Sequence, residues 1–92
     1  MRAEDTTPSP RRVLILDDHP VVRQGIKLMV NAEHDMTIVG EAQTEAEARR
    51  LVRELIPDAV IVDLSLAEGD GLHVVRDVSA HFPHIRILVL SM

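Results

Sequence analysis

Four polar residues follow aliphatic runs of this chain, and their side chains could bind metal or take part in phosphate chemistry. Asp17-Asp18, Asp63 and Ser91 each come directly after such a run. Three carboxylates held close together repel one another, so either one takes up a proton or a cation neutralises them. Magnesium suits the second case, because this hard ion prefers oxygen ligands and binds through one or two carboxylates and several waters.

Each acid also has a simpler interpretation. Asp17 and Asp18 precede Pro20, which fits the first position of a helix, so they could merely cap it. Asp63 could merely begin a turn. A functional site becomes the better hypothesis if all three carboxylates meet at one place, because caps and turns do not require convergence.

The elements that would position these residues alternate along the chain. Short apolar runs predict buried strands at residues 13–16, 36–42, 60–64 and 85–90, and apolar residues at spacings of three and four predict helices at about 20–32, 44–56 and 72–82. Such alternation implies parallel strands with right-handed crossovers and helices on both faces. We therefore predict an α/β fold, a flavodoxin-like doubly wound parallel sheet of four strands in the order 2-1-3-4 with three helices. The carboxyl ends of the first, third and fourth strands would then share one edge.

The same spacings predict which helical residues face the core. Thr44 and Glu47 form a capping-box pattern at the start of the second helix. The expected inward residues are Val22, Ile26, Met29 and Val30 in the first helix, Ala48, Leu51, Val52 and Leu55 in the second, and Leu72, Val75, Val78 and Phe82 in the third. Residues 1–10, which are polar and contain two prolines, are expected to be a disordered tail.

Composition narrows the classes of function. The chain has 92 residues and a net charge of −5, which argues against non-specific binding to nucleic acid or anionic membrane. It has no cysteine and no apolar run long enough to span a bilayer, so we expect a cytoplasmic protein.

The five histidines are not expected to form a metal site. His19, His34 and His73 are predicted to face solvent. Pro83 interrupts the helical face that His81 and His84 would need to bind a metal together.

The ordered motifs resemble the receiver domain of bacterial two-component response regulators. These motifs are LILDDHPVVRQGI at residues 14–26, D-L-x-L-x-x-x-D-G at residues 63–71 and ILVLSM at residues 87–92. The residues of these motifs are most similar to those of the NarL/FixJ subfamily of transcriptional regulators. The resemblance covers residues 11–92, which we take as the receiver domain, and each motif is weak alone but specific as part of the ordered set.

The resemblance implies roles for individual residues. Asp63 would be the phosphoacceptor, attacking a phosphohistidine of a sensor histidine kinase. Asp18 would bind Mg²⁺ directly, Asp17 would bind it through water, and Asp63 and the backbone carbonyl of Ser65 would complete the protein ligands. Ser91 would be the switch hydroxyl that meets the new phosphoryl group. The expected function is a phosphorylation switch for transcription, not an enzyme, with DNA bound only through an output domain beyond this sequence.

Two features depart from the family pattern. Ala67 occupies a position where the family usually has proline, which alters the stiffness of a loop more than its chemistry. The family's catalytic lysine follows a fifth strand, which together with the last two helices is not in the given sequence, and Lys27 in the first helix is not expected to replace it. The fourth strand would then be an exposed apolar edge, so we expect a homodimer or a swapped, self-completing oligomer.

Two alternative functions remain open. A receiver-like interaction module would keep the fold without ever being phosphorylated, and the missing lysine favours it. A phosphatase or phosphotransferase with an aspartyl nucleophile usually carries a second acid two residues after the first, where this chain has His19. A nucleotide-binding domain is disfavoured, because no glycine-rich phosphate loop follows the first strand.

Overall fold

The computed structural model describes residues 9–66 and 69–90, in which strands and helices alternate as predicted. The strands are β1 (Arg11–Leu16), β2 (Met36–Ala42), β3 (Ala59–Asp63) and β4 (Arg86–Leu90). The helices are α1 (Pro20–Asn31), α2 (Glu45–Leu55) and α3 (Gly71–His81). Over the described ranges, no helix is long and apolar enough to cross a membrane.

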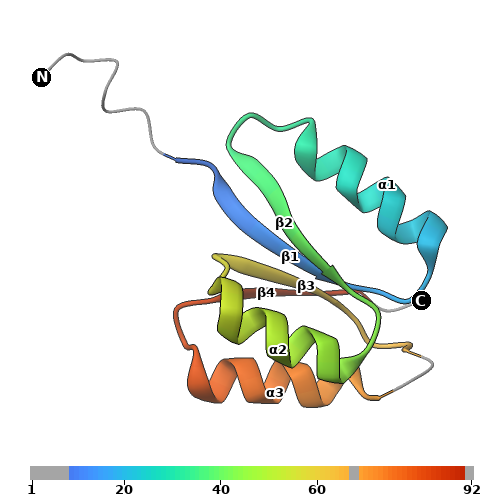
Figure 1. Ribbon diagram of the computed structural model, residues 1–92, viewed down its shortest axis with the longest axis vertical. Helices are drawn as coiled ribbons and strands as arrows, with labels where there is room; N and C mark the ends of the chain where they lie inside the picture. Colours follow the sequence, from blue (N-terminus) through green and yellow to red (C-terminus); the bar gives the residue numbers. More distant parts are fainter. Residues whose placement is uncertain (1–8, 67–68, 91–92) are drawn as a thin grey trace, which may run out of the picture.

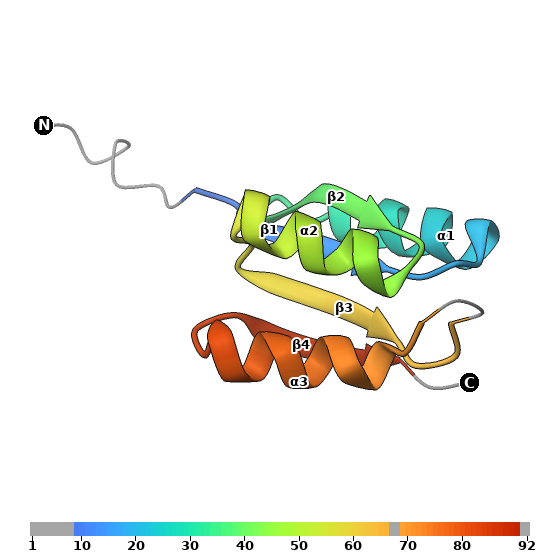
Figure 2. The ribbon, with the colours of Figure 1, turned by 60° about the horizontal axis from the view of Figure 1, so that its bottom comes forward.

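The four strands form one parallel sheet in the order β2-β1-β3-β4, which confirms the predicted α/β topology. Helix α1 covers one face of the sheet, and α2 and α3 lie side by side on the other (Figures 1 and 2). Because all strands run the same way, their carboxyl ends meet at one edge. The residues after β1 and after β3 are therefore neighbours, although they are far apart in sequence.

The central strands β1 and β3 are buried on both faces, as their unbroken apolar runs predict. Successive side chains point to opposite faces of a strand. Leu14, Leu16, Val60 and Val62 pack with α2 and α3, whereas Val13, Ile15 and Ile61 pack with α1. Aliphatic cores thus pack on both faces of the sheet, and they hold in place the strand ends that carry the acids.

Two predicted inward residues are exposed, and one buried aliphatic residue of α3 was missed. Met29 on α1 is 68% exposed, because α1 has no neighbouring helix on its face of the described structure. Leu72 on α3 is 41% exposed, whereas Val74 is fully buried. The inner face of α3 is therefore defined by Gly71, Val74 and Val78, a stripe rotated from the predicted one. The remaining predicted inward residues belong to the two cores.

The element ends differ from prediction by a few residues. Strand β1 begins at Arg11 rather than Val13, because its pairing with β2 extends to Met36. Leu64 was predicted in the third strand, but β3 ends at Asp63 and Leu64 is 38% exposed. At the start of α2, the hydroxyl of Thr44 accepts a hydrogen bond from the Glu47 N–H (3.2 Å), as predicted.

Helices α2 and α3 are joined by a charged contact around Asp77 of α3, whose side chain is only 7% exposed. The Arg53 guanidinium donates to both Asp77 oxygens (3.1 and 3.3 Å), and Arg49 lies 3.5 Å away. Arg53 also lies over the Phe82 ring, 5.5 Å from its centre. The hydrogen bond from Arg53 is the main reason why the pKa of Asp77 is lowered, and this effect outweighs burial.

An Asp77→Asn variant is expected to lower the free energy of unfolding at neutral pH by about 1 kcal/mol, since the arginines are partly exposed and screened. The lowered pKa means that this stabilisation is present above the unfolded-state value of about 3.9 and is lost as pH falls through the folded-state pKa. Urea titrations should therefore show a gap between wild type and variant that closes below about pH 4.

The matched control is Glu54→Gln, which removes the partner of Arg50 on the exposed side of α2. This variant should change the free energy of unfolding by only a few tenths of a kcal/mol, roughly the value of an exposed helical ion pair. Equal effects of the two variants at neutral pH would contradict a special role for Asp77.

Candidate functional site

The turn between β1 and α1 presents the acidic pair at the edge of the sheet. The Asp17 N–H continues the strand by donating to the Ala42 carbonyl (3.0 Å), and the Asp17 side chain is 2% exposed. Asp17 Oδ1 accepts from the His19 N–H (2.7 Å). His19 is the N-cap residue of α1, with no side-chain capping bond, and Pro20 begins the helix. The acids therefore do not cap α1, so the simpler interpretation of this pair was wrong.

Asp63 is the last residue of β3 and is also 2% exposed. Its Oδ1 atom accepts hydrogen bonds from the N–H (2.9 Å) and the hydroxyl (2.7 Å) of Ser65. These bonds do shape a turn, as the alternative interpretation of Asp63 held. They occupy only one oxygen, however, and Oδ2 faces the β1–α1 turn.

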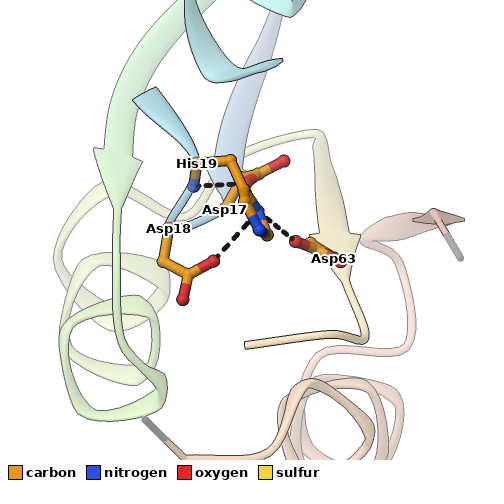
Figure 3. A group of neighbouring side chains, drawn as sticks. All are labelled: Asp17, Asp18, His19 and Asp63. Carbon is orange, nitrogen blue, oxygen red and sulfur yellow. Dashed lines mark hydrogen bonds and ion pairs between the residues drawn. The ribbon is translucent and has the colours of Figure 1, made fainter. Parts of the chain in front are cut away.

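Asp17, Asp18 and Asp63 converge on the imidazole of His19 (Figure 3). The His19 Nδ1 atom lies 3.0 Å from Asp17 Oδ1, 3.1 Å from Asp18 Oδ1 and 3.3 Å from Asp63 Oδ2. One ligand atom from each of the four residues falls within a group that is at most 4.8 Å across. We call these four residues the acidic cluster. The prediction that His19 faces solvent is confirmed for the side chain as a whole, which is 51% exposed, but the contact of its Nδ1 atom with the acids was not predicted.

These contacts shift the pKa values of two members of the acidic cluster, His19 and Asp63. The hydrogen bond to Asp17 is the main cause of a raised pKa at His19, and the charges of Asp18, Asp17 and Asp63 act in the same direction. Burial alone would raise the pKa of Asp63, but the two bonds from Ser65 and the nearby His19 outweigh it and lower that pKa. Asp63 therefore favours its ionised form, which is the form that binds cations and attacks electrophiles.

A second set of charged residues links the β1–α1 turn to β2. Arg23 of α1 donates to the Asp17 carbonyl (2.8 Å) and to Glu41 of β2 (2.9 Å). Lys27 also pairs with Glu41 (2.9 Å), and its hydrogen bond is the main cause of a lowered pKa at Glu41. Lys27 thus contacts Glu41 near the end of β2, and in the described structure its ion pair is with Glu41 and not with the acidic cluster.

The end of the β3–α3 connection, at Gly69 and Asp70, contacts the start of α2. Glu45 of α2 accepts a hydrogen bond from the Asp70 N–H (3.0 Å), and Asp70 caps α3 by accepting from the Leu72 N–H (2.8 Å). Gly69 has a φ of +88°, a conformation that favours glycine. An open cavity of about 340 Å³ lies beside this loop, but its lining includes Gly69 and Glu45 and no member of the acidic cluster.

The structure thus brings together the three predicted carboxylates. Ser65 is adjacent to them through its N–H and hydroxyl, whereas a role for its carbonyl stays a prediction. Ser91 and Ala67 lie outside the described residues. Sequence reasoning missed His19 and Arg23. The position of His19, directly after the acidic pair and at the start of a helix, was the available signal for it, but Arg23 resembled any solvated helical residue.

The donor set of the acidic cluster fits a hard divalent ion. Carboxylate oxygens from Asp17, Asp18 and Asp63 face a common centre, and Mg²⁺ binds proteins through such oxygens while retaining water. Their repulsion would also be relieved by a cation. The residues that would hold Mg²⁺ are therefore present with suitable chemistry.

Comparisons with known proteins agree with this geometry. Residues 13–92 match the family model described as response regulator receiver domain. The chain is 40% identical over 80 residues to the transcriptional regulatory protein YhcZ of Bacillus subtilis, covering 87% of this chain and 37% of that protein. The chain thus spans about a third of the length of that curated relative.

Solved structures give the same result. A LuxR-family two-component response regulator from Aurantimonas sp. SI85-9A1 is similar with a TM-score of 0.83 and 36% identity, covering 91% of this chain and 60% of that one. RcsB from Salmonella enterica serovar Typhimurium, bound to promoter rprA in the presence of phosphomimetic BeF₃⁻, has a TM-score of 0.82 and 31% identity, covering 91% and 43%. This chain belongs to the response regulator receiver domain family, and its relatives are of the LuxR/NarL type.

Proposed function

We propose that this chain is a phosphorylation switch in which Asp63 accepts a phosphoryl group from a sensor histidine kinase in the presence of Mg²⁺. The observation that carries the proposal is the convergence of Asp17, Asp18 and Asp63 at one edge of the sheet. Helix capping does not explain this arrangement, because His19 and not an aspartate is the N-cap residue of α1.

The geometry suits in-line phosphoryl transfer, in which a protein mainly positions groups and neutralises charge. A carboxylate oxygen of Asp63 would form a bond to phosphorus as the phosphorus–nitrogen bond of the phosphohistidine breaks, leaving an acyl phosphate and a histidine. Ser65 orients the carboxylate through Oδ1, and Oδ2 lies 3.3 Å from Nδ1 of His19, next to the acidic pair in the chain. Bound Mg²⁺ would supply positive charge for the phosphoryl oxygens, held by Asp18, Asp63 and the Ser65 carbonyl, and by Asp17 through water.

The acyl phosphate would act by shifting an equilibrium between two conformations that already exists. In this proposal the hydroxyl of Ser91 meets the phosphoryl group in only one of them. The signal would pass to transcription through an output domain, since a promoter-bound state is described for the relative RcsB. The chain itself would not be an enzyme with its own turnover, and its location would be the cytoplasm.

Self-association is also part of the proposal. Strand β4 is the last strand of the described sheet and pairs only with β3. Its residues Leu88 and Val89 are 58% and 41% exposed, which leaves apolar surface at a sheet edge. A homodimer or a swapped oligomer would cover this surface.

Beryllofluoride with Mg²⁺, which mimics an aspartyl phosphate, tests the switch by nuclear magnetic resonance. Mg²⁺ alone is expected to shift the amide signals of Asp63 and Ser65, and beryllofluoride should shift them further together with the signal of Ser91. The signal of Glu54, on the exposed side of α2, should stay in place as an internal control.

The result also decides between the alternatives. A response to Mg²⁺ without a further response to beryllofluoride would favour a receiver-like interaction module that binds metal but is not phosphorylated. No response of Asp63 to either addition would contradict both the metal site and the switch.

A further inference from the structure

His19 is the one member of the acidic cluster to which the proposed function gives no role. A ring nitrogen carries at most one hydrogen, so it can donate one well-aligned hydrogen bond. Nδ1 nevertheless lies within 3.3 Å of carboxylate oxygens from Asp17, Asp18 and Asp63 (Figure 3). A proton on Nδ1 accounts for one of these contacts by a hydrogen bond and for the other two by charge, and a divalent ion that displaces this proton would find the nitrogen lone pair facing the same three oxygens.

The separations match those between ligands of one metal ion. Two ligand atoms that are each about 2.1 Å from an ion lie about 3.0 Å apart at adjacent octahedral positions and about 3.4 Å apart at tetrahedral ones. The three distances from Nδ1, between 3.0 and 3.3 Å, fall in this range. The side chain is also half exposed, so the imidazole lies at the protein surface and not inside the core.

We propose that Nδ1 of His19 is a further ligand of this metal site and makes it selective for borderline divalent ions such as Zn²⁺ and Co²⁺. The inference rests on the proposed function in one respect: it assumes that the acidic cluster binds a divalent ion. Imidazole nitrogen is a good ligand for Zn²⁺ and other late first-row ions, whereas Mg²⁺ strongly prefers oxygen. His19 therefore adds affinity for the first group and little for Mg²⁺.

The test compares the binding of Mg²⁺, Co²⁺ and Zn²⁺ by calorimetry in wild type, His19→Asn and Asp63→Asn. Asparagine is a favourable N-cap residue, so His19→Asn should preserve α1. This variant is expected to weaken Co²⁺ and Zn²⁺ binding by about tenfold or more, as for other ligand-shell losses, and to leave Mg²⁺ binding within about twofold. Asp63→Asn should weaken the binding of all three ions, because it removes a shared oxygen ligand.

Two further measurements identify the ligand and the site. The visible absorption of bound Co²⁺ should change in His19→Asn, because a nitrogen ligand is lost, and a large excess of Mg²⁺ should displace Co²⁺ from the wild type. The matched control is His34→Asn, which removes an exposed histidine outside the acidic cluster and should bind all three ions like the wild type.

The outcomes separate this inference from the function on which it rests. Unchanged Co²⁺ affinity and absorption in His19→Asn, with Mg²⁺ still bound at Asp63, would overturn the role of His19 and leave the switch intact. Co²⁺ binding that Mg²⁺ does not displace and Asp63→Asn does not weaken would overturn the shared site. Absence of Mg²⁺ binding to the wild type would instead remove the proposed function.

Discussion

Asp63→Asn is expected to abolish phosphoryl-group uptake by this chain. The amide of asparagine has no carboxylate oxygen with which to attack phosphorus, whereas Ser65 can still donate its hydrogen bonds to the amide oxygen. Phosphoramidate, a small donor with a phosphorus–nitrogen bond, and Mg²⁺ should add one phosphoryl group to the wild type and none to the variant. Intact-mass spectrometry measures this directly.

Stability separates this loss of chemistry from unfolding. Because the pKa of Asp63 is lowered, its ionised form contributes stability at neutral pH, so Asp63→Asn should lower the melting temperature modestly and still unfold in one cooperative transition. Asp58→Asn is the matched control, since Asp58 lies at the opposite end of β3 and accepts a hydrogen bond from the Arg12 N–H (2.8 Å). It should still take up the phosphoryl group. Uptake by Asp63→Asn equal to that of the wild type would show that another residue is the acceptor.

Gly71→Ala is expected to damage both the fold and the site. Gly71 is the first residue of α3 and is buried against the end of β3. A Cβ atom at this position would lie 2.5 Å from the Asp63 carbonyl oxygen and 3.1 Å from Leu64 Cα. Because both contacts are with backbone, α3 or the strand end must move. Overpacking of this kind should lower the free energy of unfolding by about 1–3 kcal/mol.

The effect should also reach Asp63 itself. In Gly71→Ala, urea unfolding should have a lower midpoint, the amide signals of Asp63 and Ser65 should shift, and Mg²⁺ affinity should fall. The control is Gly25→Ala in the middle of α1, where an added Cβ meets nothing within 4 Å. It should stabilise the chain by roughly 0.5–1 kcal/mol, because alanine is the better helix former. A Gly71→Ala variant as stable as the wild type would contradict the close packing of α3 on β3.

The sequence by itself determined the architecture and the three carboxylates of the site. Strands and helices could be predicted because the spacing of apolar residues is a local signal, and strict alternation allows few sheet topologies. Asp17, Asp18 and Asp63 could be predicted because each acid interrupts the end of an apolar strand, and the ends of neighbouring parallel strands meet. Ser91 follows the same reasoning and stays a prediction.

Only the tertiary structure decided how the side chains are used. Nothing local distinguishes Val74 from Leu72, because the rotation of α3 on the sheet sets which of them is buried. The two oxygens of Asp63 have different partners: Oδ1 accepts from Ser65, and Oδ2 lies beside His19, which comes from a distant part of the chain. His19 contacts Asp63 across 44 residues of sequence, and Arg23 links the Asp17 carbonyl to β2. Such contacts arise from packing between distant segments, which no local pattern of residues records.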